Sequence, residues 1–214
     1  MRRNYFLIAA LLIVATLIVT LILYPGLPSR IPMHWNWHGE VNRYGDKWET
    51  FLMPAAMVVV ALLFAAMPWL SPRRFEVDTF RSTYLYFMLL VLTFMAYLHA
   101  LTLWAAFSKP LDMNRALLGA LFLLLTLFGN VLGRVRRNFF IGVRTPWTLS
   151  SEKVWDATHR FAARAFVLAG LLGLLSMVVS ASPIAGLVIV GVAGSASVLY
   201  SLAYYKRLER RNQL

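Results

Sequence analysis

FLMPAAMVVVALLFAAMPWL, residues 51–70, contains no charged side chain from its first residue to its last. An α-helix rises 1.5 Å per residue, so about 20 apolar residues cross the roughly 30 Å hydrocarbon core of a bilayer. This stretch therefore predicts a transmembrane helix.

Five further windows meet the same criterion, and together the six account for more than half of the chain. They are Tyr5–Tyr24, Tyr84–Phe107, Arg115–Gly133, Arg164–Ala181 and Ile184–Tyr205. The composition agrees, because 60% of the 214 residues are hydrophobic and only 14% are charged, far from a soluble domain. The predicted fold class is an all-α membrane protein, a polytopic bundle of six transmembrane helices forming a single membrane domain, 1–214.

The first window follows Met-Arg-Arg-Asn, which resembles the start of a signal peptide. Its apolar run is too long for one and no small-residue cleavage site follows, so we interpret it as a retained anchor, with a cleaved signal as the alternative.

The distribution of Lys and Arg predicts the orientation, because short basic loops stay in the cytoplasm. With the N-terminus inside, the outer segments hold only Arg30, Arg43, Lys47, Lys109 and Arg115, and the other Lys and Arg residues, including Arg73 and Arg74, fall inside. Both termini are therefore predicted to be cytoplasmic. The net charge of +12 is spread over membrane boundaries, which favours anionic lipids as partners over direct nucleic-acid binding. Without cysteine, disulfides and thiolate chemistry are excluded.

Two connections are long and polar: an outer loop, 25–50, and an inner loop, 134–160. The inner loop is predicted to be extended up to Pro146, with a turn at Gly142. Ser150 is predicted to cap a helix that begins near Ser151, and Asp156 and Arg160 have the spacing of a helical ion pair. An interfacial helix with snorkelling arginines is the plainer interpretation. The remaining connections are short, and Ser182-Pro183 predicts a tight hairpin between the last two helices.

Small residues predict where helices approach closely. One such seam is Gly129-x-x-x-Gly133, and a second comprises Ala193, Ser197 and Ser201 with Gly194 beside them. Packing within the bundle is favoured over dimerisation.

The outer loop holds residue types that bind metals, with His34 and His38 four residues apart and Glu40 nearby. His99 is an ionisable residue deep within a predicted span, which makes it a functional candidate. Pro32 and Gly39 disfavour a continuous helix through these ligands, and interfacial anchoring is the favoured interpretation. No metal or other cofactor is predicted, and no motif for a nucleophile or a phosphate-binding loop is present.

Two longer motifs resemble a known family. RNFFIGVRTPWTLSSEKVWDATHR (137–160) resembles the signature of the SdpI/YfhL family, and IPMHWNWHGEVNRYGDK (31–47) resembles that of a domain of unknown function that often precedes it. His38 falls at a position that the second signature leaves open. The resemblance divides the chain into an N-terminal two-helix part, 1–70, and an SdpI-like part, 115–205.

The resemblance implies a multi-pass protein of the bacterial cytoplasmic membrane that gives immunity to a secreted, membrane-active peptide toxin. It also implies a sensing role, in which the toxin-bound protein holds an autorepressor at the membrane. The inner residues that it assigns to partner binding or to structure are Arg137, Asn138, Gly142, Arg144, Thr145, Pro146, Trp147, Thr148, Trp155, Thr158, His159 and Arg160. The outer residues are Pro32, His34, Trp35, Asn36, Gly39 and Lys47.

Three hypotheses follow. The leading one is a non-enzymatic immunity protein that protects against, and senses, a peptide toxin. The second is a membrane enzyme or transporter acting on an envelope lipid or small molecule, with His34, His99 and Glu40 as candidate groups for proton transfer or metal binding. The third is a membrane receptor that only sequesters a cytoplasmic repressor.

Overall fold

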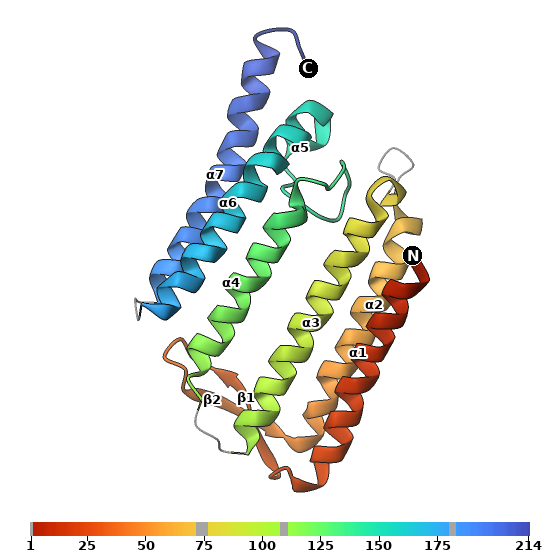
Figure 1. Ribbon diagram of the computed structural model, residues 1–214, viewed down its shortest axis with the longest axis vertical. Helices are drawn as coiled ribbons and strands as arrows, with labels where there is room; N and C mark the ends of the chain where they lie inside the picture. The colour runs from red at the N-terminus through yellow and green to blue at the C-terminus, as the bar shows by residue number, and fades with distance from the viewer. Residues whose placement is uncertain (1, 72–76, 108–110, 180–182) are drawn as a thin grey trace. The chain divides into compact units, whose positions relative to one another are not determined.

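A computed structural model describes residues 2–71, 77–107, 111–179 and 183–214 (Figure 1). Within these residues six helices are long and apolar enough to cross a membrane. They are α1 (Arg2–Leu23), α2 (Leu52–Leu70), α3 (Arg81–Ala106), α4 (Met113–Leu132), α6 (Glu152–Val178) and α7 (Pro183–Glu209). The predicted polytopic helical membrane fold is thereby confirmed. The orientation stays a prediction, and Arg73, Arg74, Lys109 and Ser182 lie outside the described residues.

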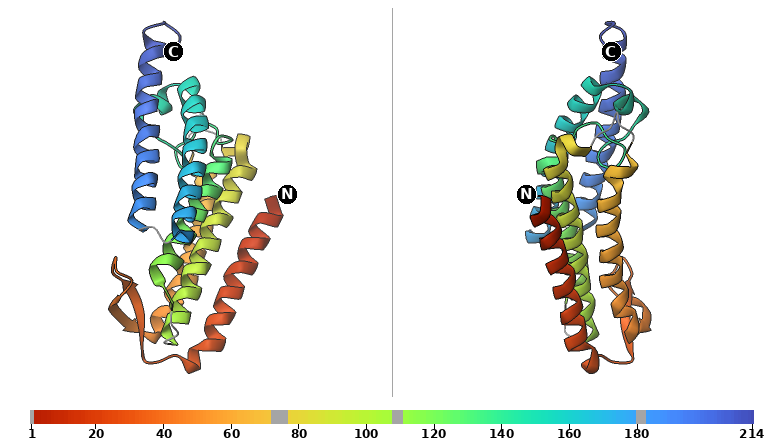
Figure 2. Two further views of the ribbon diagram at one scale, coloured as in Figure 1. Left: turned by 60° about the vertical axis from the view of Figure 1, so that its left-hand side comes forward. Right: turned by 90° about the vertical axis from the view of Figure 1, so that its right-hand side faces the viewer.

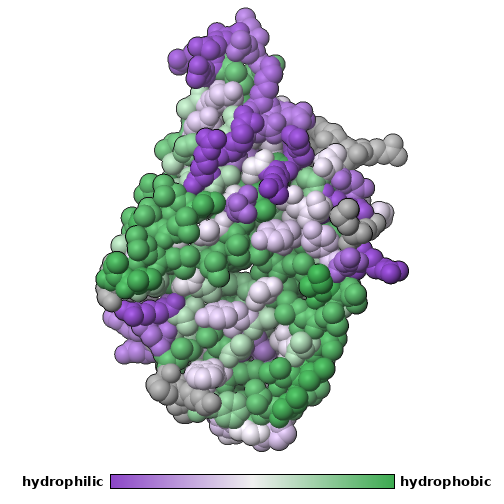
Figure 3. Space-filling model, in the orientation of Figure 1, coloured by the Kyte–Doolittle hydropathy of each residue, from purple (hydrophilic) through white to green (hydrophobic). Residues whose placement is uncertain are grey.

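The chain divides into two compact units, and α2, α3 and α4 contribute residues to both. Unit 1 comprises Met1–Ala65 and Met88–Ala120, and unit 2 comprises Ala66–Phe87 and Leu121–Leu214. In unit 2, Figure 3 shows hydrophobic residues over the middle of α6 and α7 and hydrophilic residues at the C-terminal end of α7. This is the surface of helices that face lipid, where apolar side chains cover the span and polar ones its ends.

Unit 1 contains the 25–50 region, which was expected to be only a polar loop. It forms a β-hairpin of β1 (Arg30–Trp35) and β2 (Val41–Asp46), followed by a 3₁₀ turn, η2 (Lys47–Phe51). The strands are antiparallel, Arg30 lies opposite Asp46, and the register shifts on both sides of His34. Ile31 is buried in an apolar cluster with Leu27, Leu103 and Ala106, so residues of α3 hold the base of the hairpin.

Unit 2 is built on the antiparallel pair of α6 and α7, which lie side by side in Figures 1 and 2. Phe161, near the start of α6, stacks on Tyr200, near the end of α7, with ring centroids 4.6 Å apart and planes 3° from parallel. Ser197 and Ser201 of α7 are fully buried, which confirms the predicted small-residue face. Gly194 is not part of it, because a Cβ there would meet open space.

The predicted seam on α4 is also confirmed at Gly129, which lies against α6. A Cβ added to Gly129 would come within 2.7 Å of the backbone nitrogen of Val167 and 2.9 Å of the carbonyl oxygen of Ala163. Two backbones can approach this closely only without a side chain between them. The seam therefore serves packing inside unit 2.

About two turns before this seam, the buried ring of Phe122 on α4 fills space left by glycines of two other helices. A Cβ at Gly173 of α6 would lie 2.5 Å from the ring, and a Cβ at Gly186 of α7 would overlap its tip. Phe122 thus joins three helices of unit 2 at one point.

Candidate functional site

The polar segment between α4 and α6, residues 134–151, is called here the motif segment and belongs to unit 2 (Figure 1). Asn138 is buried at its first turn and makes four hydrogen bonds. Its amide nitrogen donates to the carbonyls of Arg136 (2.8 Å) and Ile141 (3.0 Å), and its oxygen accepts from the backbone N–H groups of Phe140 and Ile141, both at 2.7 Å. An asparagine can satisfy a turn in this way because one amide carries both donors and acceptors. Asn138 therefore fixes the course of residues 136–141.

Trp155 and His159, both on α6 and both fully buried, tie that helix to the motif segment. The indole N–H of Trp155 donates to the carbonyl of Val135 at 2.7 Å, and the rings of Trp155 and His159 stack with centroids 3.9 Å apart. Nδ1 of His159 lies 2.8 Å from the carbonyl of Trp155, and Nε2 lies 3.1 Å from the backbone nitrogen of Val143. A carbonyl only accepts and an N–H only donates, so Nδ1 carries the proton and Nε2 accepts.

This contact explains the glycine of the motif. Gly142 has a φ of +118°, and a Cβ there would overlap Nε2 of His159. The position therefore needs glycine for two reasons, the left-handed backbone and the imidazole that lies against it.

The predicted extended conformation at Thr145 is confirmed, with φ −109° and ψ 162°. Thr145 caps a five-residue helix, α5 (Pro146–Ser150), that the sequence analysis did not predict. The side chain of Thr145 accepts a hydrogen bond from the backbone N–H of Thr148. In return, the backbone N–H of Thr145 donates to the hydroxyl of Thr148 at 2.9 Å. Thr145 Oγ1 also lies 3.1 Å from Ser201 Oγ on α7. The Thr-Pro-Trp-Thr sequence thus ties the motif segment to a second helix.

Two details of the predicted helix start are wrong. The N-cap of α6 is Ser151, whereas the hydroxyl of Ser150 donates to the carbonyl of Trp147 at 3.0 Å, because the chain is still in α5 there. Asp156 pairs with Arg136 at 3.7 Å, not with Arg160, because the motif segment folds back alongside α6.

The assigned inner residues therefore divide into buried and accessible groups. Asn138, Thr145, Thr148, Trp155, Thr158 and His159 are buried. Gly142, Arg144, Pro146 and Arg160 are exposed, and Arg137 and Trp147 are half-buried. Arg144 donates to the carbonyl of Phe139 at 2.6 Å while its side chain stays accessible. The buried group can hold the segment together, and the accessible group can meet a partner.

In unit 1, Asn36 shapes the tip of the hairpin. Its side-chain oxygen accepts from the backbone N–H groups of His38 (2.9 Å) and Glu40 (3.0 Å), and Gly39 completes the turn with a φ of +84°. The amide of Asn114 donates to the carbonyl of Trp37 at 2.9 Å. The tip is thereby fixed to the start of α4, a contact that sequence spacing gave no means of finding.

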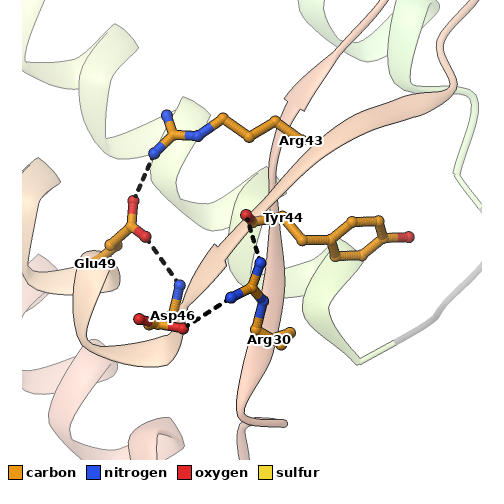
Figure 4. A network of polar contacts seen from close by, with 5 residues as sticks. All are labelled: Arg30, Arg43, Tyr44, Asp46 and Glu49. Carbon is orange, nitrogen blue, oxygen red and sulfur yellow. Dashed lines mark hydrogen bonds and ion pairs between the residues drawn. The ribbon is translucent and has the colours of Figure 1, made fainter.

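A polar network holds the base of the hairpin (Figure 4). Glu49 of η2 accepts from the backbone N–H of Asp46 at 2.9 Å and pairs with Arg43 at 3.0 Å. Arg30 pairs with Asp46 across the strands at 3.2 Å. Figure 4 shows the ring of Tyr44 pointing away from the Arg43–Glu49 pair. The network fixes which side chains the hairpin presents outward.

The histidines named as metal candidates each have a different neighbour. His34 Nδ1 lies 2.6 Å from Asn42 Oδ1, and Nε2 of His99 lies 2.7 Å from Thr20 Oγ1. The ring of His38 packs against that of Trp37 with the planes tilted by 40°. Among the described residues, no three His, Asp or Glu side chains come together as metal ligands. Thr20 already donates to the carbonyl of Thr16, so His99 donates to Thr20 and joins α3 to α1.

The hairpin and the η2 turn that follows it also expose three aromatic side chains. Trp37 is 73% exposed, Tyr44 53% and Trp48 55%. Large exposed aromatics on a braced element are common in binding surfaces and in membrane-interface belts. The density of tryptophans between residues 35 and 48 was the signal that could have marked them.

Comparison with known proteins agrees with both motifs. A domain of unknown function (DUF1648) matches residues 11–58, and the SdpI/YfhL protein family matches residues 134–202. The Immunity protein SdpI of Bacillus subtilis (strain 168) is 28% identical over 210 residues, which cover 97% of this chain and 98% of that protein. Residues 134–202 thus resemble the SdpI/YfhL family, and the chain as a whole is similar to one immunity protein. No solved structure matches it significantly.

The SdpI/YfhL match contains the complete buried network of unit 2, from Asn138 through His159 to Ser201. The DUF1648 match contains the hairpin, most of α1 and the first turns of α2. The chain is thus a multi-pass membrane protein that is similar to an immunity protein over nearly its whole length.

Proposed function

We propose that this chain is an immunity protein of the bacterial cytoplasmic membrane that protects its cell against a secreted, membrane-active peptide toxin. The observation that carries the proposal is the identity with the Immunity protein SdpI, which extends over nearly the full length of both chains. A likeness limited to one motif would support a shared local structure, whereas this one includes all six spans and both polar regions.

The hairpin is our candidate for the surface that meets the toxin. Trp37, Tyr44 and Trp48 offer large, rigid contact area, and such side chains contribute most of the binding free energy in many interfaces. Asn114 and the Glu49 network hold the hairpin in place before binding, which lowers the entropy cost of association. A toxin helix bound there would have less apolar surface left to disturb lipid.

The motif segment has a different role in this proposal. Its buried side chains are bonded to one another and to α6 and α7, as expected of a structural brace. Arg144 and Trp147 remain accessible on its surface and are the candidates for passing a toxin signal to a cytoplasmic partner. The autorepressor itself stays a prediction.

The test is survival of a toxin-sensitive strain that expresses the protein at matched membrane abundance. Trp37→Ala and His34→Ala are expected to weaken protection, because they remove exposed hairpin side chains without disturbing the buried clusters. The matched control is Trp69→Ala, which removes an 86% exposed tryptophan outside the hairpin and should leave protection intact.

Arg144→Ala and Trp147→Ala test the motif segment in the same assay. Full protection by both variants at normal abundance would show that its accessible residues have no part in immunity. Full protection by Trp37→Ala and His34→Ala would remove the hairpin from the proposal.

The enzyme or transporter alternative gains no support from the geometry. His34, Glu40 and His99 bond to Asn42, Asn36 and Thr20 respectively, so each side chain has its own partner and no shared centre is formed by these contacts.

A further inference from the structure

A cleft of about 420 Å³ lies in unit 2 and is separate from the hairpin. Its lining comes from the motif segment, from the N-terminus of α6 and from the C-terminal part of the chain, and includes Arg137, Ser151, Glu152, Lys153 and Tyr205. The ammonium group of Lys153 donates to the carbonyl of Gln213 at 2.6 Å, so the chain beyond α7 folds back toward the start of α6. Immunity as proposed above gives this cleft no role.

The helix start in this cleft has an unused cap. Ser151 is the N-cap of α6, with extended φ and ψ, but its hydroxyl makes no capping hydrogen bond. The residue is only 9% exposed and lines the cleft. Serine at an N-cap normally accepts from an N–H of the first turn. Here the first intrahelical bond is donated by Trp155 to Ser151, so the preceding N–H groups have no acceptor within the helix.

The charges of the lining complement an anion at this position. The N-terminus of a 27-residue helix carries a partial positive charge, and Arg137 and Lys153 add two full charges. Arg137 also donates to the carbonyl of Leu149 at 3.4 Å, as Lys153 does to that of Gln213. A guanidinium, an ammonium, a hydroxyl and free backbone N–H groups are the donors that bind phosphate in proteins. The lining also contains Leu214 and the carboxylate of Glu152. The carboxylate of Glu152 opposes a bound anion, and its replacement is one of the tests below.

The surroundings favour a lipid as the source of the phosphate. Tyr205 lies near the end of α7, where the apolar run gives way to Lys206, Arg207, Arg210 and Arg211. Figure 3 shows this end of α7 covered by hydrophilic residues, next to the hydrophobic surface of the span. Basic residues at such a boundary meet the headgroups of anionic lipids.

We propose that the cleft between Arg137, Ser151 and Lys153 binds the phosphate group of an anionic phospholipid. A bound phosphate would accept hydrogen bonds from the Ser151 hydroxyl and the first N–H groups of α6, and so complete the cap that the protein leaves open. The motif segment and α6 would then be held together by a lipid as well as by Trp155 and His159.

The experiment measures binding of dihexanoyl phosphatidylglycerol to the purified full-length protein in neutral detergent, with inorganic phosphate as a second probe. Ser151→Asp places a carboxylate where the phosphate would bind, and should lower lipid affinity at least about tenfold. The same change should raise the unfolding temperature without lipid, because aspartate caps a helix well and complements its dipole. A purely structural role for Ser151 predicts no loss of lipid binding.

Two further variants test how charge affects lipid affinity, one inside the cleft and one, as the control, outside it. Glu152→Gln should raise lipid affinity, because it removes a carboxylate from the lining. Arg207→Gln removes an exposed positive charge from α7 outside the cleft. It weakens only the general attraction of the headgroup, so it should lower lipid affinity less than Ser151→Asp does.

Equal losses in Ser151→Asp and Arg207→Gln would show that only general surface charge attracts the lipid, and would overturn the site. Binding of inorganic phosphate without binding of the lipid would overturn the assignment of a phospholipid. Binding of the lipid at lower concentration than phosphate, lost in Ser151→Asp alone, is the result that we expect.

Discussion

Replacing Gly142 with alanine tests the contact between the motif segment and α6. The φ of +118° is a conformation that alanine rarely adopts, and such strain costs about 1–3 kcal/mol. The new Cβ would also overlap Nε2 of His159 and separate it from the N–H of Val143, and a buried hydrogen bond left unmade costs about 1–3 kcal/mol. Gly142→Ala should therefore reduce the free energy of unfolding by about 2–6 kcal/mol.

The assay is reversible unfolding in mixed micelles, followed by tryptophan fluorescence. Gly194→Ala is the matched control, because it makes the same chemical change in α7 where a Cβ meets open space, and it should stabilise slightly or have no effect. In a His159→Ala background the imidazole that the new Cβ would overlap is absent. There, Gly142→Ala should lower the free energy of unfolding only by the backbone strain. Equal stability of Gly142→Ala and Gly194→Ala would refute the reasoning.

Three further outcomes can be checked in the same preparations or in cells. Asn138→Ala should destabilise by at least about 2 kcal/mol, because it leaves buried backbone groups of one turn unpaired; a smaller loss would mean that the turn does not depend on the amide. Thr20→Val should lower the free energy of unfolding by about 1 kcal/mol, which is typical of a polar contact between membrane helices. If the same change has no effect in a His99→Ala background, the contact between Thr20 and His99 is confirmed. Because the chain has no cysteine, single cysteines introduced as His38→Cys and Gln213→Cys report its orientation in the membrane. On intact cells an impermeant maleimide should label only His38→Cys. Labelling of Gln213→Cys would show that the predicted orientation is wrong.

The helices could be predicted because each needs only a long apolar run, a property local to its own residues. The hairpin was missed because its strands lack the usual alternation of buried and exposed residues: Ile31 and Pro32 are both buried, and the register shifts at His34. Its position depends on contacts with Leu103 and Asn114, far away in sequence, which no local pattern reveals.

The sequence motif named the residues of the candidate site but did not give their roles. The motif marked Asn138, Gly142 and His159 together, yet nothing in their spacing distinguishes a buried brace from an exposed binding face. That distinction depends on how the motif segment folds back on α6 and brings Val143 to the imidazole. The open cap at Ser151 was missed for a related reason, since Ser150 and Ser151 are equivalent in sequence and only the course of α5 separates them.

The position of Phe122 has a consequence for how this part of the molecule can vary. Its ring occupies the space that side chains at positions 173 and 186 would need. The side chains at these three positions therefore compete for one common volume. A methyl group added on α6 or α7 would need to be matched by a smaller residue on α4. In related chains, a larger residue at position 173 or 186 should therefore occur together with a smaller one at position 122. In this chain, Gly173→Ala should be tolerated when Phe122 is replaced by leucine or valine, but not when Phe122 is retained.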